Sequence, residues 1–144
     1  MRINKPLAFS KWRPVAQAMP KMQQELARHP ELGCIRTENW FGRTTISVQY
    51  WRDYESLYAY ARNPSESHLP AWRAFNKAIR DNGTVGIWHE TFRVEPGGTE
   101  SIYGNMPRVG LGAAFDHVQV VAGQHSAAKR MQVADSDDTA VEPY

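Results

Sequence analysis

Residues 34–51 read CIRTENWFGRTTISVQYW, and this stretch decides the fold class. A turn at Gly42-Arg43 separates two runs rich in β-branched and aromatic residues, 34–40 and 44–51, which predicts a β-hairpin. In the second run Ile46, Val48 and Tyr50 share one face of a strand, and Thr45, Ser47, Gln49 and Trp51 share the other. One face of the predicted hairpin is therefore apolar and the other is mixed.

Helical periodicity flanks this hairpin on both sides. Apolar residues at helical spacing predict an amphipathic helix from Pro14 to about Arg28, which Pro20 either kinks or, as a first-turn residue, begins. After the hairpin, Asp53 is the expected N-cap of a helix that runs to Ala61 and ends at Asn63-Pro64. A further helix is predicted from Leu69 to Arg80, with Trp72 and Phe75 toward the core, and the turn Asp81-Asn82-Gly83 ends it.

Alternation predicts a long strand from Val85 to Val94, a short strand from Ser101 to Tyr103, and then an ordered, glycine-rich loop from Gly104 to Ala114. With a short strand at the extreme N-terminus, the order becomes β-α-β-β-α-β plus an extra strand, which is typical of the α+β ferredoxin-like arrangement. Its four-stranded sheet carries helices on one side only. We therefore expect a homodimer in which two bare sheet faces cover each other.

The length of 144 residues, with 42% apolar residues, indicates one globular domain, which we place at 1–122. Residues 123–144 are rich in small and acidic residues and are predicted to form a flexible tail. No apolar run is long enough to span a membrane, and the start lacks a secretory core. The single cysteine excludes a disulfide framework and multi-cysteine metal sites, so we expect a reducing cytoplasm.

Basic residues dominate the opening segment, because five of them precede the first acid, Glu25. They are Arg2, Lys5, Lys11, Arg13 and Lys21. A solvated face beside an acidic partner surface is the simpler interpretation, and a weak contact with an anion or a membrane surface is the alternative. The net charge of +2 is too small to indicate nucleic acid, and the partner prediction is a small molecule with neither nucleic acid nor membrane.

Several contiguous motifs carry a family resemblance. They are AMPKM (18–22), VQYWR (48–52), YAYAR (58–62), HLPAWRAFN (68–76), VGIWHET (85–91), IYGNMP (102–107) and GLG (110–112). From Met1 to Ala114 the chain resembles the family of uncharacterised proteins that includes the fumagillin-pathway monooxygenase, grouped with the antibiotic-biosynthesis monooxygenases. The resemblance implies a dimeric α/β barrel. Since members have apolar first-strand residues before the position of Met1, we expect either an upstream start or a shortened first strand.

The resemblance also implies an oxidoreductase that needs no metal or flavin, in which an electron-rich, small apolar or aromatic substrate reduces oxygen after the pocket deprotonates it. His89 is the first candidate for the base, and Glu90, Tyr50, Arg73 and Asn105 are candidate donors, acceptors or charge partners. His89 and Glu90 point to opposite faces of a strand. A structural histidine, and an ion pair of Glu90 with Arg52, Arg73 or Arg93, are the alternatives.

Aromatic residues near these candidates are predicted to pack in the core or to line the substrate pocket. They are Trp51, Trp72, Phe75 and Trp88. The segment 105–107 with the following glycines is expected to form a dimer-interface turn rather than a substrate lid. Cys34 is expected to be a small buried apolar residue and not a nucleophile.

Haem is the alternative cofactor, because His68 or His89 could serve as its axial ligand in a haem carrier or a haem-dependent enzyme such as a dehydratase. An exposed histidine at a helix start is the simpler interpretation of His68. A mononuclear metal site is disfavoured, since no two histidines have ligand spacing. A non-catalytic ligand-binding dimer remains the third hypothesis.

Overall fold

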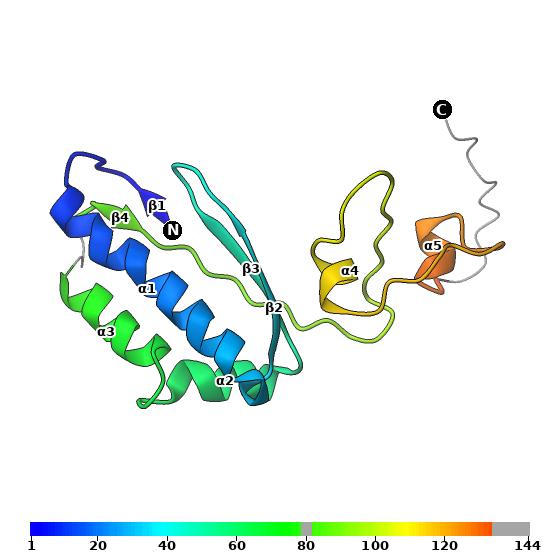
Figure 1. Cartoon of the computed structure of the whole chain (residues 1–144), viewed down its shortest axis with the longest axis horizontal. Coiled ribbons are helices and arrows are strands. Elements are labelled where there is room, and N and C mark those ends of the chain that lie inside the picture. The colour runs from blue at the N-terminus through cyan, green and yellow to red at the C-terminus, as the bar shows by residue number, and fades with distance from the viewer. Residues whose placement is uncertain (79–81, 134–144) are drawn as a thin grey trace. The chain divides into compact units, whose positions relative to one another are not determined.

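The computed structural model describes residues 1–78 and 82–133, and the chain divides into two compact units, Met1–Glu90 and Thr91–Tyr144. The first unit contains, in order, β1 (Arg2–Ile3), α1 (Phe9–Arg28), the 3-10 helix η1 (Pro30–Leu32), β2 (Cys34–Trp40), β3 (Ile46–Trp51), α2 (Tyr54–Arg62), α3 (His68–Ala78) and β4 (Val85–Gly86) (Figure 1). The second unit contains the short helices α4 (Leu111–Ala114) and α5 (Ala127–Arg130). Helices and two-stranded antiparallel sheets make the chain an α+β protein, as predicted.

The predicted hairpin is confirmed as β2 paired with β3 in antiparallel register. Trp40 pairs with Ile46, Glu38 with Val48 and Arg36 with Tyr50, with an irregularity between Cys34 and Arg36. The turn falls at Gly42-Arg43, where glycine and polar residues interrupt the β-branched and aromatic runs.

Helix α1 begins at Phe9, so the prediction that it starts at Pro14 was wrong. Both Pro14 and Pro20 lie inside the helix, where each removes one backbone hydrogen bond. The buried side chains of Met22 and Leu26, one turn apart, anchor the helix to the core, and this tertiary packing outweighs the local cost of the prolines.

Strand β1 lies between β4 and the segment that leads into β3. Ile3 pairs with Val85 of β4, and an isolated antiparallel bridge joins Arg2 to Thr44. The Thr45 amide also donates to the Met1 carbonyl oxygen at 2.8 Å. The two two-stranded sheets, β1–β4 and β2–β3, are therefore joined only through the segment just before β3, which gives the strand order β4–β1–β3–β2 among the described residues.

Helices α2 and α3 follow their predictions closely. The backbone N–H of Ser56 donates to Asp53 Oδ1 at 2.6 Å, which confirms Asp53 as the N-cap of α2. The predicted helix from Leu69 to Arg80 is α3, and Arg80 lies outside the described residues. Trp72 is 44% exposed, so its assignment to the core of this chain was wrong.

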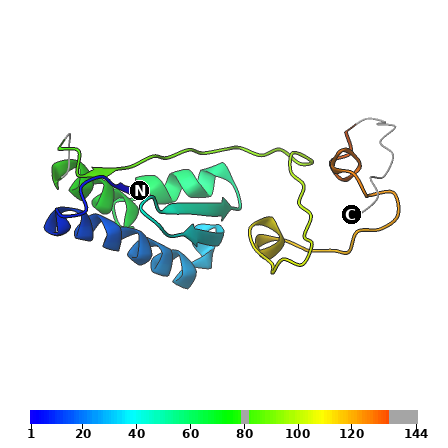
Figure 2. The ribbon, with the colours of Figure 1, turned by 90° about the horizontal axis from the view of Figure 1, so that it is seen from above.

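The two faces of the hairpin have different surroundings. The side-chain amide of Gln23 in α1 donates to Asn39 Oδ1 at 2.9 Å and to Ser47 Oγ at 3.1 Å, which places these residues on the helix side (Figure 2). Strand alternation then places Trp40, Ile46 and Val48 on the opposite side, where their exposed fractions are 50%, 42% and 36%. We call this side the open face.

The prediction of a long strand from Val85 to Val94 was wrong, because β4 ends at Gly86. The side chains of residues 87–94 are all exposed, and no strand pairs with this segment in the described part of the chain. Alternation alone does not make a strand, since each strand needs a partner for its backbone groups. The short strand predicted from Ser101 to Tyr103 is absent from the described residues for the same reason.

Tyr103 stands just before the predicted loop 104–114 and is hydrogen-bonded to two residues of that loop. Its hydroxyl donates to the Val109 carbonyl oxygen and accepts from the Gly112 backbone N–H at 2.8 Å, just inside α4. Further along, Arg130 of α5 forms an ion pair with Glu100 at 2.9 Å. The helix α5 lies within the predicted tail 123–144, of which residues 134–144 fall outside the description, and the boundary at 122 stays a prediction.

Candidate active site

The open face presents an apolar strip beside charged and phenolic groups. Ile46, Val48 and Tyr50 follow one another along β3 with their side chains on this face. Across from them on β2, Arg36 Nε donates to Glu38 Oε1 at 2.8 Å. At the other end of the same row, Arg2 Nη1 donates to Thr44 Oγ1 at 2.9 Å. Such a face can hold a flat apolar molecule and place a hydrogen bond or a positive charge at its edge.

The opposite side of the hairpin packs aromatic rings against the helices. Trp51 meets Tyr60 of α2 with ring centroids 5.7 Å apart, and Tyr60 meets His68 of α3 at 6.0 Å. Tyr60 is only 4% exposed. Trp51 therefore packs within the unit, and its role in lining a substrate pocket stays a prediction.

Glu25 of α1 joins this aromatic group through its carboxylate. The Tyr60 hydroxyl donates to Glu25 Oε2 at 2.7 Å, the Ser67 hydroxyl to Oε1 at 2.9 Å and the Ser67 backbone N–H to Oε2 at 3.1 Å. Burial alone would raise the pKa of Glu25, but these hydrogen bonds together hold the pKa below its usual range. Glu25 is thus an ionised, satisfied group that fastens α1 to the segment between α2 and α3.

Tyr60 is correspondingly held in its neutral form. Burial and the hydrogen bond to the Glu25 carboxylate both raise the pKa of its phenol. The pair therefore has a structural role at neutral pH, since neither group can exchange a proton without losing its partner. This network was not predicted from the sequence. Glu25 stands three residues after Met22 in the apolar stripe of α1, and an acid at such a position is a signal for a buried partner.

His68 begins α3, and its side chain is half-buried. The interpretation of His68 as an exposed residue at a helix start was therefore wrong. Its Nδ1 lies 3.1 Å from the Ala61 carbonyl oxygen, which assigns the ring proton to Nδ1. This leaves Nε2 as the atom able to bind iron, in the orientation that ligating histidines generally have. However, His68 lines neither the hollow formed by residues between 14 and 71 nor the one formed by residues between 101 and 120.

The predicted catalytic residues are not brought together in one cluster. His89 and Glu90 are exposed after β4 and make no hydrogen bond or ion pair with the described residues, while Arg73 is exposed on α3. Asn105 belongs to the second unit, where its φ of 51° forms a left-handed turn residue. Tyr50 is the member that lies within the sheet, and the assignment of all five stays a prediction.

The remaining predicted aromatic residues occupy separate places. Trp72 and Phe75 stack on one another along α3, with ring centroids 5.7 Å apart. Trp88 is 65% exposed after β4. These exposures leave Trp72 and Trp88 available to a ligand or to a second copy of the chain.

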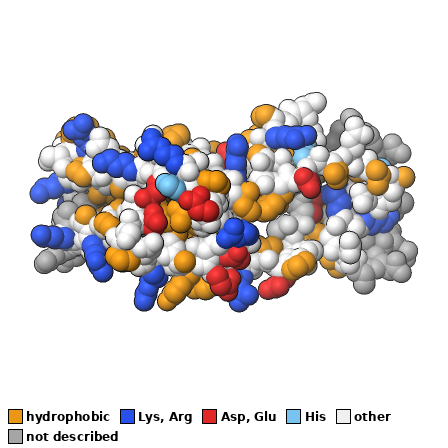
Figure 3. Space-filling view, turned by 60° about the horizontal axis from the view of Figure 1, so that its bottom comes forward, with side chains coloured by type: hydrophobic (Ala, Val, Ile, Leu, Met, Phe, Trp, Pro, Cys, Tyr) orange, Lys and Arg blue, Asp and Glu red, His pale blue; other side chains and the backbone are white. Residues whose placement is uncertain are grey.

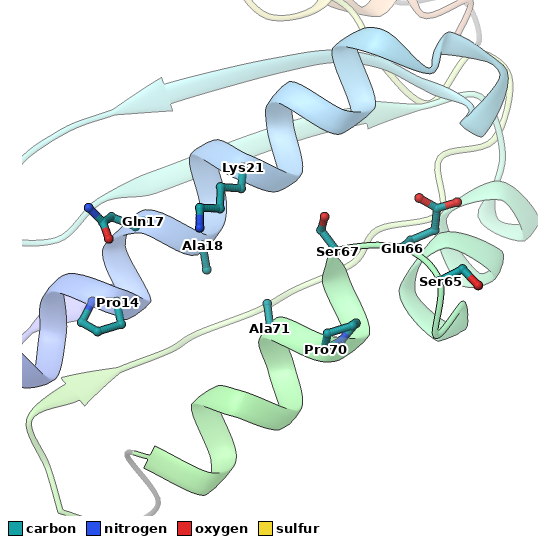
Figure 4. A pocket seen from close by; sticks show the side chains of 9 residues that line it. All are labelled: Pro14, Gln17, Ala18, Lys21, Ser65, Glu66, Ser67, Pro70 and Ala71. Carbon is teal, nitrogen blue, oxygen red and sulfur yellow. The ribbon is translucent and has the colours of Figure 1, made fainter.

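A groove of about 480 Å³ separates α1 from α3 and the segment before it (Figure 4). It is lined by Pro14, Gln17, Ala18, Lys21, Ser65, Glu66, Ser67, Pro70 and Ala71. None of the predicted catalytic residues is among them. Small side chains on the facing helices leave the hollow open, and its charged lining residues are Lys21 and Glu66.

The described residues do not favour a metal-binding site or a reactive thiol. No group of three or more His, Cys, Asp and Glu side chains within 1–78 and 82–133 is placed to hold a metal ion. Burial raises the pKa of the Cys34 thiol, which disfavours the reactive thiolate. None of the described helices combines the length and the apolar character needed to cross a bilayer.

Comparisons with known proteins give one consistent result. Residues 1–111 match the family described as monooxygenase af470-like. Among curated proteins, monooxygenase af470 of Aspergillus fumigatus is 36% identical over 107 residues, which cover 69% of this chain and 38% of that protein. The chain therefore spans less than half of this relative's length. No solved structure matches.

Proposed function

Because the chain belongs to the monooxygenase af470-like family, we propose that it is a monooxygenase-type oxidoreductase acting on a small apolar or aromatic metabolite. The observation that carries the proposal is the open face, where an apolar strip adjoins the Tyr50 phenol and the Arg36 guanidinium. The family indicates the reaction class, and the open face is where we expect the substrate to bind.

The strand order β4–β1–β3–β2 supports the ferredoxin-like arrangement, since this is the antiparallel order that a split βαβ motif produces. The open face would then lie opposite the same face of a second copy in a homodimeric α/β barrel, with the substrate held between the two faces. The single cysteine, together with a thiol that burial keeps protonated, supports a cytoplasmic home for this dimer.

The register of β1 gives a basis for inferring which face the residues after β4 would take. Arg2 pairs with both Thr44 and Gly86, so Gly86 belongs to the open face together with Ile46, Val48 and Tyr50. Residues 87–90 are not paired as a strand in the single chain, but if pairing extended β4 beyond Gly86, alternation would bring Trp88 and Glu90 to this face and His89 to the opposite one. We therefore place Trp88 against the substrate and prefer Glu90 to His89 as its base, with Tyr50 as a hydrogen-bond donor.

The chemistry needs no external reductant when the substrate carries an acidic CH₂ group beside an electron-rich ring. A carboxylate removes one proton, and the resulting carbanion gives its electrons to oxygen. One oxygen atom forms a new C=O bond, and the other leaves as water with the two hydrogen atoms of the CH₂ group. Arg36, which is paired with Glu38 in the single chain, would have to turn from that carboxylate to stabilise the anion that forms before oxygen reacts.

The experiment is oxygen uptake with a panel of electron-rich aromatic compounds, followed by mass spectrometry of the product. We expect Glu90→Gln to lower the rate constant by about a hundredfold or more, which is typical of a lost general base. His89→Gln is the matched neighbouring control and should retain most activity. If Glu90→Gln kept full activity and His89→Gln lost it, His89 and not Glu90 would be the base.

The Nδ1 hydrogen bond of His68 supports haem binding as a second candidate function. An absorption spectrum after haem addition distinguishes it, because a stoichiometric Soret band lost in His68→Ala would favour a haem protein. A colourless dimer that binds the aromatic panel without oxygen uptake would instead indicate the non-catalytic ligand-binding protein.

A further inference from the structure

One end of the first unit gathers several chain segments that are distant in sequence. Strand β1 ends there at Ile3, β2 ends at Trp40, and α1 begins at Phe9. The Ile3 backbone N–H donates to the Arg43 carbonyl oxygen at 3.2 Å, which joins the first strand to the hairpin turn. The loop 4–8 and the turn 41–45 therefore project from the same end of the sheet.

Large apolar side chains stand at the tips of these segments. Leu7 is 101% exposed, Phe41 83% and Phe9 55%. Phe9 packs edge-on against Trp12 with ring centroids 4.8 Å apart, and Trp12 Nε1 donates to the Pro6 carbonyl oxygen at 2.8 Å. These contacts hold the loop against α1, so the apolar tips are presented by an ordered structure. Leu7, Phe9 and Phe41 come from segments that meet at this end, and exposed apolar side chains gathered in this way are typical of an interaction surface.

Among the residues that the structure describes, the charged ones next to these tips in the sequence are all positive. Residues 1–24 and 39–52 contain no aspartate or glutamate, and the cations that surround the tips are Lys5, Lys11, Arg13 and Arg43. We call this set of residues, with Leu7, Phe9 and Phe41, the basic end. Acidic side chains of the first unit lie toward the far end of α1 and on α2, and Figure 3 shows basic side chains where α1 begins with the acidic ones further along.

We propose that the basic end docks on the surface of an anionic phospholipid membrane. Leu7, Phe9 and Phe41 would enter the boundary between headgroups and acyl chains, and the four cations would contact the phosphate and carboxylate groups of the lipids. Charge argues against a second copy as the partner, because two basic ends would repel each other. A nucleic acid would contact the cations, but it would not explain the exposed aliphatic side chain of Leu7.

This surface is separate from the open face and does not depend on the proposed function. The test is flotation of the full-length chain with vesicles of phosphatidylcholine, alone or with about 30% phosphatidylserine. We expect binding to the anionic vesicles, weaker binding as salt is raised, and little binding to pure phosphatidylcholine.

Variants separate the apolar and the charged contributions. The double variant Leu7→Ser with Phe41→Ser should bind the anionic vesicles at least about tenfold more weakly. The triple variant of Lys5, Lys11 and Arg13 to Gln should bind about a hundredfold more weakly. Val118→Ser and Arg28→Gln are matched controls, since Val118 is 76% exposed and Arg28 lies in the last turn of α1, and both should bind as the unchanged chain does.

Three results would overturn the proposal. The first is equal flotation with neutral and anionic vesicles, or binding that the basic-end variants leave unchanged. The second is binding to single-stranded RNA that Leu7→Ser with Phe41→Ser leaves intact and that displaces the chain from vesicles. The third is a change from dimer to monomer in that double variant, which would make the basic end an interface between copies.

Discussion

At the scale of single residues, the clearest feature is the carboxylate of Glu25. It accepts hydrogen bonds from Tyr60 and Ser67, which come from a helix and a loop far along the chain. A carboxylate with these partners fixes the distance between α1 and the α2–α3 connection, because each bond is lost if the segments separate.

Replacing Tyr60 with Phe removes one hydrogen bond to an ionised group and keeps the ring that packs on Trp51. We expect the free energy of unfolding to fall by about 1.5 kcal/mol. Denaturant unfolding followed by tryptophan fluorescence measures this change. Tyr58→Phe, on an exposed side of the same helix, is the control and should leave the midpoint unchanged.

We expect the free energy of unfolding to fall at acid pH, because the Glu25 carboxylate becomes protonated. The pKa of Glu25 in the folded chain is lower than its ordinary value of 4.5, so the unfolded chain binds more protons in this range. The stabilisation is complete above pH 4.5 and is lost as the pH falls through the lower folded pKa. Glu25→Gln should flatten this part of the pH profile, and a variant with an unchanged acid limb would contradict the role given to Glu25.

The sequence predicts local roles at this scale better than distant ones. Asp53 was predicted as an N-cap, because a cap depends on a backbone amide only three residues away. The partners of Glu25 lie 35 and 42 residues away, and no local pattern encodes such a distance. The five predicted catalytic residues show the same limit, since a site joins positions that only the tertiary fold brings near.

At the scale of elements, the Tyr103 loop shows how one side chain replaces regular structure. The Tyr103 ring lies so close to Gly112 that a Cβ there would be 2.8 Å from the ring. Only glycine therefore allows the Tyr103 hydroxyl to meet both Val109 and Gly112, and this explains the spacing of IYGNMP and GLG along the chain.

Gly112→Ala should displace the Tyr103 ring and loosen the loop. We expect a destabilisation of the loop by about 1–3 kcal/mol, which is typical of overpacking. Hydrogen exchange at the Gly112 region measures it, with faster exchange as the expected result. Gly104→Ala is the matched control, because a Cβ at Gly104 meets nothing within 4 Å. Equal protection in the two variants would show that the Tyr103 contact does not hold the loop.

Elements with local partners were predicted well, and those with distant partners were not. The hairpin has its turn and both strands within 18 residues, and its first strand has the predicted bounds, Cys34–Trp40. The strand expected at 85–94 alternates just as clearly, but β1 offers it only Arg2 and Ile3 as partners. The length of β4 is therefore set by its neighbour and not by its own residues.

At the scale of the whole molecule, we expect the open face to make the chain a homodimer. Its apolar residues remain exposed in the single chain, and covering them removes that apolar surface from water. Val48→Lys should convert the dimer to a monomer, because the charge would be buried without a partner. Light scattering reports the mass, which should fall from twice 16.4 kDa to 16.4 kDa.

Tyr54→Lys serves as the control for this experiment. Tyr54 is 45% exposed on α2, away from the open face, so the variant should stay dimeric. If light scattering gives a monomer for the wild-type chain at all concentrations, no second copy covers the open face. Only the substrate would then bind there.

Turnover under ¹⁸O₂ with the panel of electron-rich aromatic compounds tests the proposed monooxygenase activity. We predict a product that carries one ¹⁸O atom, with the other recovered in water. The rate should fall in Trp88→Ala and Tyr50→Phe but not in Lys21→Ala, which changes the groove beside α1. Turnover that is lost in Lys21→Ala and kept in the open-face variants, or no oxygen uptake with any compound of the panel, would contradict the proposal.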